Sequence, residues 1–81
     1  MRLHAHARER MLERGANEDE VEATIREGER FAAKFGREGF RRNFHFDGVW
    51  RERHYAMKQV EALAVFEDGD WLVISVIVKY F

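Results

Sequence analysis

The stretch VEALAVFEDGDWLVISVIVKY, from Val60 to Tyr80, decides the fold. Two runs rich in Val, Ile, Leu and Phe flank Glu67-Asp68-Gly69-Asp70, which is typical of an antiparallel hairpin. The sequence therefore predicts strands over residues 60–66 and 71–80, joined by a two-residue turn at Asp68-Gly69.

Both faces of this predicted hairpin are apolar. One face carries Leu63, Val65, Leu72, Ile74, Val76 and Val78, and the other carries Ala62, Ala64, Phe66, Trp71, Val73, Ser75 and Ile77. A sheet covered by helices on one side needs only one apolar face. The second face is therefore covered either by the rest of the sheet or by another chain. The second possibility predicts a homodimer or a protein partner at the 60–80 hairpin.

A second hairpin is predicted upstream. Aromatic residues alternate with polar ones up to Asp47-Gly48, a strong signal for a two-residue hairpin turn. This predicts strands over residues 39–46 and 49–55. The period-two pattern of Phe31, Ala33 and Phe35 predicts a short strand over residues 30–35, with continuation of the preceding helix as the competing interpretation.

Two helices precede the strands. The first is predicted over residues 4–14 and stops at Gly15, and the second is predicted over residues 18–28 after a capping box formed by Asn17 and Glu20. Helices followed by strands are typical of an α+β domain. The expected fold is an N-terminal helical hairpin packed on one face of a mainly antiparallel sheet of four to five strands.

Composition limits the function classes. The 81 residues predict a single domain, residues 1–81, and a formal charge of -1 gives no overall positive field for nucleic acid. The absence of cysteine excludes disulfides and thiolate metal sites. No apolar run is long enough to span a membrane, so a cytoplasmic location without membrane contact is expected.

The predicted upstream hairpin gathers chemically useful side chains on its polar face. With the turn at Asp47-Gly48, this face carries Arg41, Asn43, His45, Trp50, Glu52 and His54. His45, Glu52 and His54 could supply a general acid and base beside an anion-binding arginine. Simple solvation of a polar face is the alternative interpretation.

The same register places Arg42 directly opposite Arg53. Like charges across a ladder are destabilising unless something relieves them. Three explanations are open: an internal carboxylate, an anionic ligand such as an RNA phosphate, or a longer loop that shifts the register.

The first helix supplies another candidate cluster. His6, Arg10 and Arg14 follow one another at intervals of four residues beside the apolar stripe of the helix. They could line a cleft between helix and sheet, or the arginines could simply cover apolar surface and pair with nearby acids. Residues two apart point in different directions on a helix, so His4 and His6 cannot chelate one ion; neither a metal nor a cofactor is expected.

The segment from His6 to Gly15, HARERMLERG, resembles the bacterial family called domain of unknown function 4258, whose signature is close to H-A-x-x-R-M-x-x-R-G. The family departs from this chain at Ala16, where an aliphatic residue such as Ile is more usual. Its arrangement is similar to that of the RelE and barnase group of metal-independent ribonucleases and toxins. The resemblance implies that His6 would act as acid or base, and that Arg10, Arg14, Arg42 or Arg53 would bind phosphate.

Two functions follow as hypotheses. We favour a non-catalytic protein-interaction or homodimer module, because the second hairpin is apolar on both faces and the overall charge is nearly balanced. Such a module would be a homodimer or half of a pair with an antitoxin-like or regulatory protein. The alternative is a metal-independent RNA endonuclease or RNA-binding domain of the RelE toxin type, acting alone or as part of a toxin-antitoxin pair.

Overall fold

The first helix begins and ends close to the predicted positions. In the computed structural model, which describes residues 1–81, α1 spans Ala5–Arg14. The His4 side chain accepts a hydrogen bond of 3.1 Å from the backbone N–H of His6 at the start of the helix. Gly15 ends it in the left-handed region at φ 78°, and its N–H donates to the carbonyl of Met11.

The second helix, α2, spans Glu18–Glu27 and has the predicted capping box. The backbone N–H of Glu20 donates to Asn17 Oδ1 at 2.8 Å, and the N–H of Asn17 donates to Glu20 Oε1 at 2.9 Å. At Gly28 a β-carbon would lie only 2.4 Å from the carbonyl oxygen of Thr24, so only glycine allows this direct passage from α2 into the sheet.

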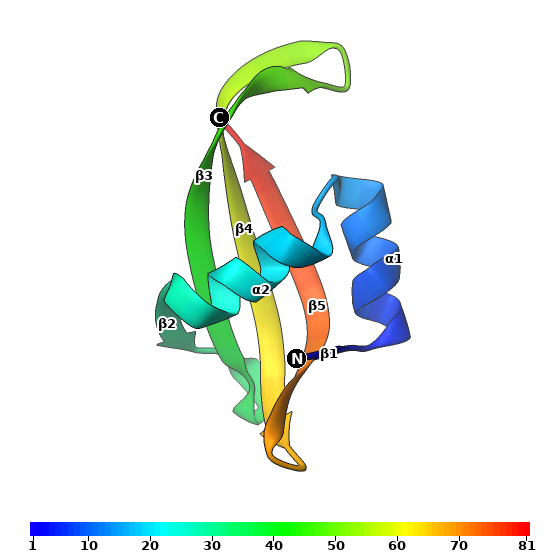
Figure 1. The fold of residues 1–81 in the computed structure, drawn as a ribbon, viewed down its shortest axis with the longest axis vertical. Helices are drawn as coiled ribbons and strands as arrows, with labels where there is room; N and C mark the ends of the chain where they lie inside the picture. Colours follow the sequence, from blue (N-terminus) through cyan, green and yellow to red (C-terminus); the bar gives the residue numbers. More distant parts are fainter.

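The sheet has five strands in the order β1-β5-β4-β3-β2. The strands are β1 (Arg2–Leu3), β2 (Glu29–Ala32), β3 (Glu38–Trp50), β4 (Arg53–Glu67) and β5 (Asp70–Tyr80). Only the β1–β5 pair is parallel. Two N-terminal helices packed on a mainly antiparallel sheet confirm the predicted α+β class (Figure 1).

The predicted turn at Asp47-Gly48 is wrong. β3 continues through these residues with a bulge, where the pairing to β4 shifts between His45 and Gly48 and Asp47 has φ 40°. The chain reverses instead at Arg51-Glu52, with φ values of 49° and 69°. Positive φ at both positions is the geometry of a type I′ turn, which here is built without Asn or Gly.

This later turn changes the strand boundaries. The predicted strands 49–55 and 60–66 do not exist as separate strands, because β4 runs unbroken from Arg53 to Glu67. The predicted strand 30–35 ends early: β2 stops at Ala32, and a 3-10 turn follows over Lys34–Gly36. Phe35 lies in that turn at φ 62°, outside the extended region that a strand requires.

The second hairpin has its turn at Asp68-Gly69, as predicted, with φ values of 53° and 74°. Its predicted faces are wrong beyond Ile74. Leu63 pairs with Ser75 but Ala64 pairs with Val73, so Ile74 is an extra residue in β5. This bulge moves Val76 and Val78 to the face of Val73, and Ser75 and Ile77 to the face of Leu63.

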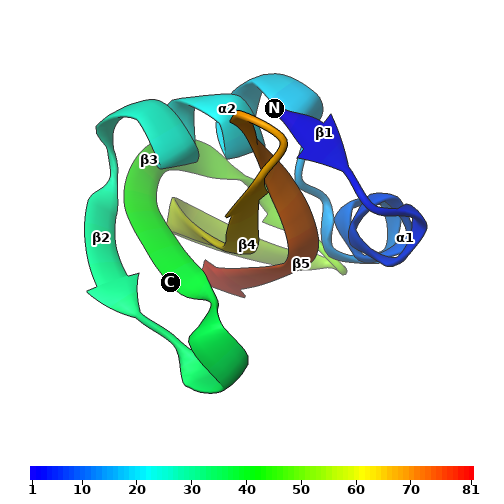
Figure 2. The same cartoon turned by 90° about the horizontal axis from the view of Figure 1, so that it is seen from below.

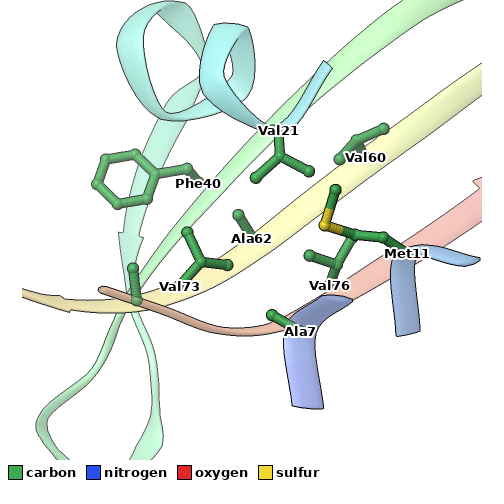
Figure 3. Close-up of a cluster of buried hydrophobic side chains, with 9 residues drawn as sticks. Ala7, Met11, Val21, Phe40, Val60, Ala62, Val73 and Val76 are labelled. Carbon is green, nitrogen blue, oxygen red and sulfur yellow. The ribbon is translucent and has the colours of Figure 1, made fainter. Parts of the chain in front are cut away.

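The core lies between the helices and one face of the sheet. It consists of apolar side chains from both helices and three strands: Ala7, Met11, Val21, Phe40, Val60, Ala62, Ala64, Val73 and Val76 (Figure 3). Both helices lie on this side, with α2 across the sheet and α1 along β5 (Figures 1 and 2). We call the opposite side of the sheet the outer face.

Candidate functional site

The predicted cluster on α1 does not form a pocket. His6 is exposed, and its ring makes no hydrogen bond within the chain. Arg10 donates to Glu13 at 2.8 Å, and Arg14 donates to the backbone carbonyl of Val76 at 2.7 Å. The surface has two hollows of about 340 and 350 Å³, and the second lies beside α1, but neither is lined by His6, Arg10 or Arg14.

The C-terminal end of α1 is held by side chains from the sheet. Arg51 Nη2 donates to the carbonyl of Glu13 at 3.2 Å, Tyr80 Oη donates to that of Arg14 at 2.8 Å, and Lys58 Nζ donates to that of Gly15. The last carbonyls of a helix have no partners inside the helix. These three donors therefore supply the missing partners and fix the end of α1 on the sheet.

Within the segment that resembles a known family, several residues have structural contacts. Ala7 and Met11 are buried in the core. The Arg14 side chain donates a hydrogen bond to the backbone carbonyl of Val76 on β5. Gly15 lies so close to Trp50 that a β-carbon would come within 2.6 Å of the ring. These contacts give the four residues a structural role, and at Gly15 they leave no room for a β-carbon.

Lys58 and Glu20 form a buried ion pair that the sequence analysis missed. Lys58 Nζ lies 2.8 Å from Glu20 Oε1, and the two side chains are only 6% and 18% exposed. The rings of Phe46 and Tyr80 lie 5.8 and 5.9 Å from Nζ. A sequence signal exists: Lys58 stands in the same alternation as buried Val60, Ala62 and Ala64, and a lysine there needs an acid.

Tyr80 lies beside this ion pair, with its ring 5.9 Å from Lys58 Nζ. Its ring stacks on Trp50 with centroids 5.0 Å apart and planes 14° from parallel. Burial raises the pKa of the Tyr80 hydroxyl, the carboxylate of Glu20 raises it further, and Arg51 partly opposes them. Tyr80 is therefore held in its neutral form, as a hydrogen-bond donor to α1.

The second predicted cluster, on the upstream hairpin, is dispersed by the bulge and the later turn. His45 pairs with Met57, Glu52 lies in the turn, and His54 Nε2 lies 2.8 Å from Asp47 Oδ1. Trp50 does not lie among these polar side chains, because it stacks on Tyr80. The expected polar face is not assembled; the one close pair is His54 with Asp47.

The predicted juxtaposition of Arg42 and Arg53 is also wrong. Arg42 pairs with Val60 and its Nη1 lies 3.1 Å from Glu27 Oε2, whereas Arg53 pairs with Trp50. An internal carboxylate neutralises Arg42, as one of the three explanations had it. The register differs through the bulge and the later turn at Arg51-Glu52, and not through a longer loop. No anion is needed to relieve a like-charge pair.

The outer face of β4 and β5 has no helix over it and carries aliphatic side chains, with Glu61 and Ser75 among them. The register places Leu63, Val65, Leu72 and Ile77 on this face, and all four are partly exposed. None of them belongs to the core between the sheet and the helices. The shift caused by Ile74 makes this apolar area smaller than predicted, because Val76 and Val78 leave it.

No protein-family model, no curated protein and no solved structure matches the chain. The resemblance to domain of unknown function 4258 therefore stays a prediction. The chain contains no helix long and apolar enough to cross a membrane.

Proposed function

We propose that this chain is a non-catalytic protein-interaction module whose binding surface is the outer face of β4 and β5. The observation that carries the proposal is the row of partly exposed aliphatic side chains on this face, Leu63, Val65, Leu72 and Ile77. An open antiparallel sheet normally presents polar residues to water. An apolar surface on a partner protein would complete the burial of these side chains.

The positions of the predicted catalytic residues support a binding role. His6, Arg10 and Arg14 line no hollow, and Arg42 is neutralised by Glu27. A general acid or base must lie within reach of the group that it protonates, beside a group that stabilises the developing charge.

A cytoplasmic location belongs to the same proposal, because a chain without cysteine suits a reducing compartment.

Site-specific photo-crosslinking tests this binding surface. A photoreactive residue at Leu63, introduced into the chain expressed in its own host, is expected to give one adduct of defined mass. The same residue at Leu12 is the control, because Leu12 is apolar and 85% exposed but lies on α1. Adducts from both positions, or from Leu12 alone, would mean unspecific capture and would overturn the proposal.

A second candidate function is metal-independent RNA cleavage or RNA binding, of the kind found in RelE-type toxins. The observation that favours it is the close contact of His54 Nε2 with Asp47 Oδ1. A carboxylate that orients an imidazole is a common arrangement in acid-base catalysis. Both residues are exposed, so RNA could reach them.

RNA incubated with the protein in EDTA tests this alternative. Cleavage that survives chelation and is lost in His54→Ala, but not in His6→Ala, would assign the activity to the hairpin. The reverse pattern would assign it to α1. Absence of cleavage by the unaltered protein would remove the endonuclease alternative for free RNA, and absence of binding would remove the RNA-binding one.

A further inference from the structure

Phe35 is the most exposed large apolar residue of the chain. It lies in the 3-10 turn Lys34–Gly36 between β2 and β3 and is 88% exposed. Its backbone is in the left-handed region, at φ 62° and ψ 36°. A bulky residue rarely adopts this conformation, because its β-carbon crowds the following carbonyl. The chain therefore carries two unfavourable features at one residue, an exposed aromatic ring and a strained backbone.

Nothing within the chain offsets these two features. The Phe35 ring takes no part in the core and lies 6.0 Å from the guanidinium of Arg37, and such a contact is weak at an exposed site. Gly36, the next residue, has open space around it, so the turn is not packed against the rest of the chain. Leu12 is 85% exposed, but it lies in a regular helix, where a single exposed side chain is ordinary. Backbone strain at an exposed ring points to a role outside the chain.

The turn that carries Phe35 lies at one end of the outer face. The backbone N–H of Ala33 donates to the carbonyl of Arg37 at 2.9 Å and closes the turn. β3 begins directly after it with Glu38 opposite Ala64, so the turn lies next to Val65. In Figure 2, α2 lies along the upper side of the molecule, and the turn after β2 projects from the lower side, away from both helices. Phe35 is thus at the margin of the outer face.

The outer face reaches β2 through Phe31. Leu63 on β4, Gly39 on β3 and Phe31 on β2 form one row across the sheet. The Phe31 ring fills the space over Gly39, where a β-carbon would lie 2.3 Å from the ring. Arg41 lies 4.6 Å from the centroid of the same ring. Phe31 therefore continues the row of aliphatic side chains of β4 and β5 across the sheet to β2, the strand that leads into the turn of Phe35.

Two cationic side chains flank the Phe35 ring. Neither Lys34 nor Arg37 forms an ion pair within the chain, and no acid lies between them in the sequence. The next residue, Glu38, is already paired with Arg30 at 3.2 Å. The turn therefore presents an apolar ring between two positive charges that the chain does not neutralise.

We propose that Phe35 is the aromatic anchor of the outer face, and that the partner is a protein with an apolar pocket rimmed by carboxylates. This inference rests on the proposed function, because the partner would cover the outer face. An aromatic side chain that enters a pocket commonly carries much of the binding energy of an interface. Carboxylates around the pocket would complement Lys34 and Arg37.

The strained backbone favours a protein over a lipid surface. A turn that holds the Phe35 ring in one position lowers the entropy cost of entering a pocket of defined shape. Lipid tails accept a ring in many orientations, so a fixed position brings no comparable gain. Two cations also attract an anionic membrane only weakly, since electrostatic membrane binding depends on clusters of four or more.

Unfolding of the purified chain tests whether the strain serves a purpose outside the fold. Phe35→Gly removes the ring and the strain together, so it is expected to raise the midpoint of thermal unfolding by roughly 2 to 5 °C. Phe31→Gly is the control and is expected to lower the midpoint, because the Phe31 ring covers Gly39. A midpoint that Phe35→Gly does not raise would show that the ring supports the turn, and would overturn the proposal.

Photo-crosslinking tests the partner. A photoreactive phenylalanine at position 35, in the chain expressed in its own host, is expected to give the same adduct partner as one at Leu63, attached beside Asp or Glu residues of that partner. Lys34→Glu is expected to lower the yield of this adduct about fivefold. Arg8→Glu is the matched control, because Arg8 is also exposed and forms no ion pair but lies on α1, and it is expected to leave the yield unchanged.

The outcomes separate this inference from the proposed function. An adduct from Leu63 without one from Phe35 would overturn the anchor and leave the proposed function in place. An adduct from Phe35 alone, or from neither position, would overturn both. Equal yields from Lys34→Glu and Arg8→Glu would overturn the acidic partner. Vesicles of phosphatidylserine and phosphatidylcholine test the lipid surface: binding by the unaltered chain that is lost in Phe35→Ala would assign the ring to a membrane and overturn the proposal.

Discussion

Trp50 stacks on Tyr80 with ring centroids 5.0 Å apart, although the two residues lie on β3 and β5, with β4 between them. The stack covers Gly15 at the end of α1, and the Tyr80 hydroxyl donates to the carbonyl of Arg14. These contacts hold the turn end of the long β3–β4 hairpin against the C-terminal end of α1.

Replacing Gly15 by Ala should destabilise the protein by about 2 to 4 kcal/mol. The β-carbon would come within 2.6 Å of Trp50 and Tyr80, and φ 78° is unfavourable for alanine. Gly36→Ala is the control, because Gly36 has φ 70° but open space around it. Chemical denaturation should show a cost of about 1 to 2 kcal/mol there. Equal costs at both glycines would mean that the aromatic stack does not press on Gly15.

Replacing Lys58 by Met should cost about 3 kcal/mol, because the carboxylate of Glu20 would be left largely buried without its partner. Adding Glu20→Gln should restore part of the loss. Gln keeps the oxygen that accepts from Asn17 in the capping box but carries no charge. Denaturation of the single and double variants measures the difference. A double variant less stable than Lys58→Met would show that the charge on Glu20 is not the source of the loss.

The helices and the fold class could be predicted because their signals are local. The capping box of Asn17 and Glu20 lies within four residues, and Gly15 ends α1 by its own backbone preference. The two-residue strand β1 could not be predicted. Its pairing with Leu72 and Val73 depends on contacts from the other end of the chain.

The predicted strand registers were wrong because a bulge leaves only a weak signal in the local sequence. Asp47-Gly48 is a strong turn signal, yet here the positive φ of Asp47 serves a bulge, and the turn uses Arg51-Glu52. Each bulge moves the following residues to the other face. The cross-strand clusters inferred from the unbulged register, including the Arg42–Arg53 pair, were therefore wrong. The ion pair of Lys58 and Glu20 was missed for a related reason, since Lys58 was not placed in the strand.

Replacing Glu52 by Gly should stabilise the protein by about 0.5 to 1 kcal/mol. Glu52 has φ 69° in the turn between β3 and β4, a value that glycine adopts without strain. The same substitution at Gln59, inside β4, should be destabilising, because glycine weakens a strand. Thermal or chemical unfolding of both variants makes the comparison. Destabilisation by Glu52→Gly would be incompatible with a turn at this position.

Tyr80 should make stability fall at alkaline pH. Burial and the carboxylate of Glu20 raise the pKa of Tyr80 in the folded protein above its usual value of 10.0. In the unfolded chain the hydroxyl ionises at about 10, so between the two pKa values the folded state binds more protons than the unfolded state. The free energy of unfolding then decreases as pH rises. The contribution of Tyr80 is fully present below pH 10 and is lost as pH rises through the folded pKa.

Denaturation of the unaltered chain and of Tyr80→Phe from about pH 8 to about pH 11 measures this effect. Tyr80→Phe should be the less stable of the two near pH 8, because it lacks the hydrogen bond to Arg14. The gap should narrow above about pH 10, since only the unaltered chain must keep this hydroxyl protonated. Tyr55→Phe controls for removing a tyrosine that makes no hydrogen bond here. A gap that stays constant or widens with pH would mean that burial and the Glu20 carboxylate leave the Tyr80 hydroxyl as free to ionise as it is in water.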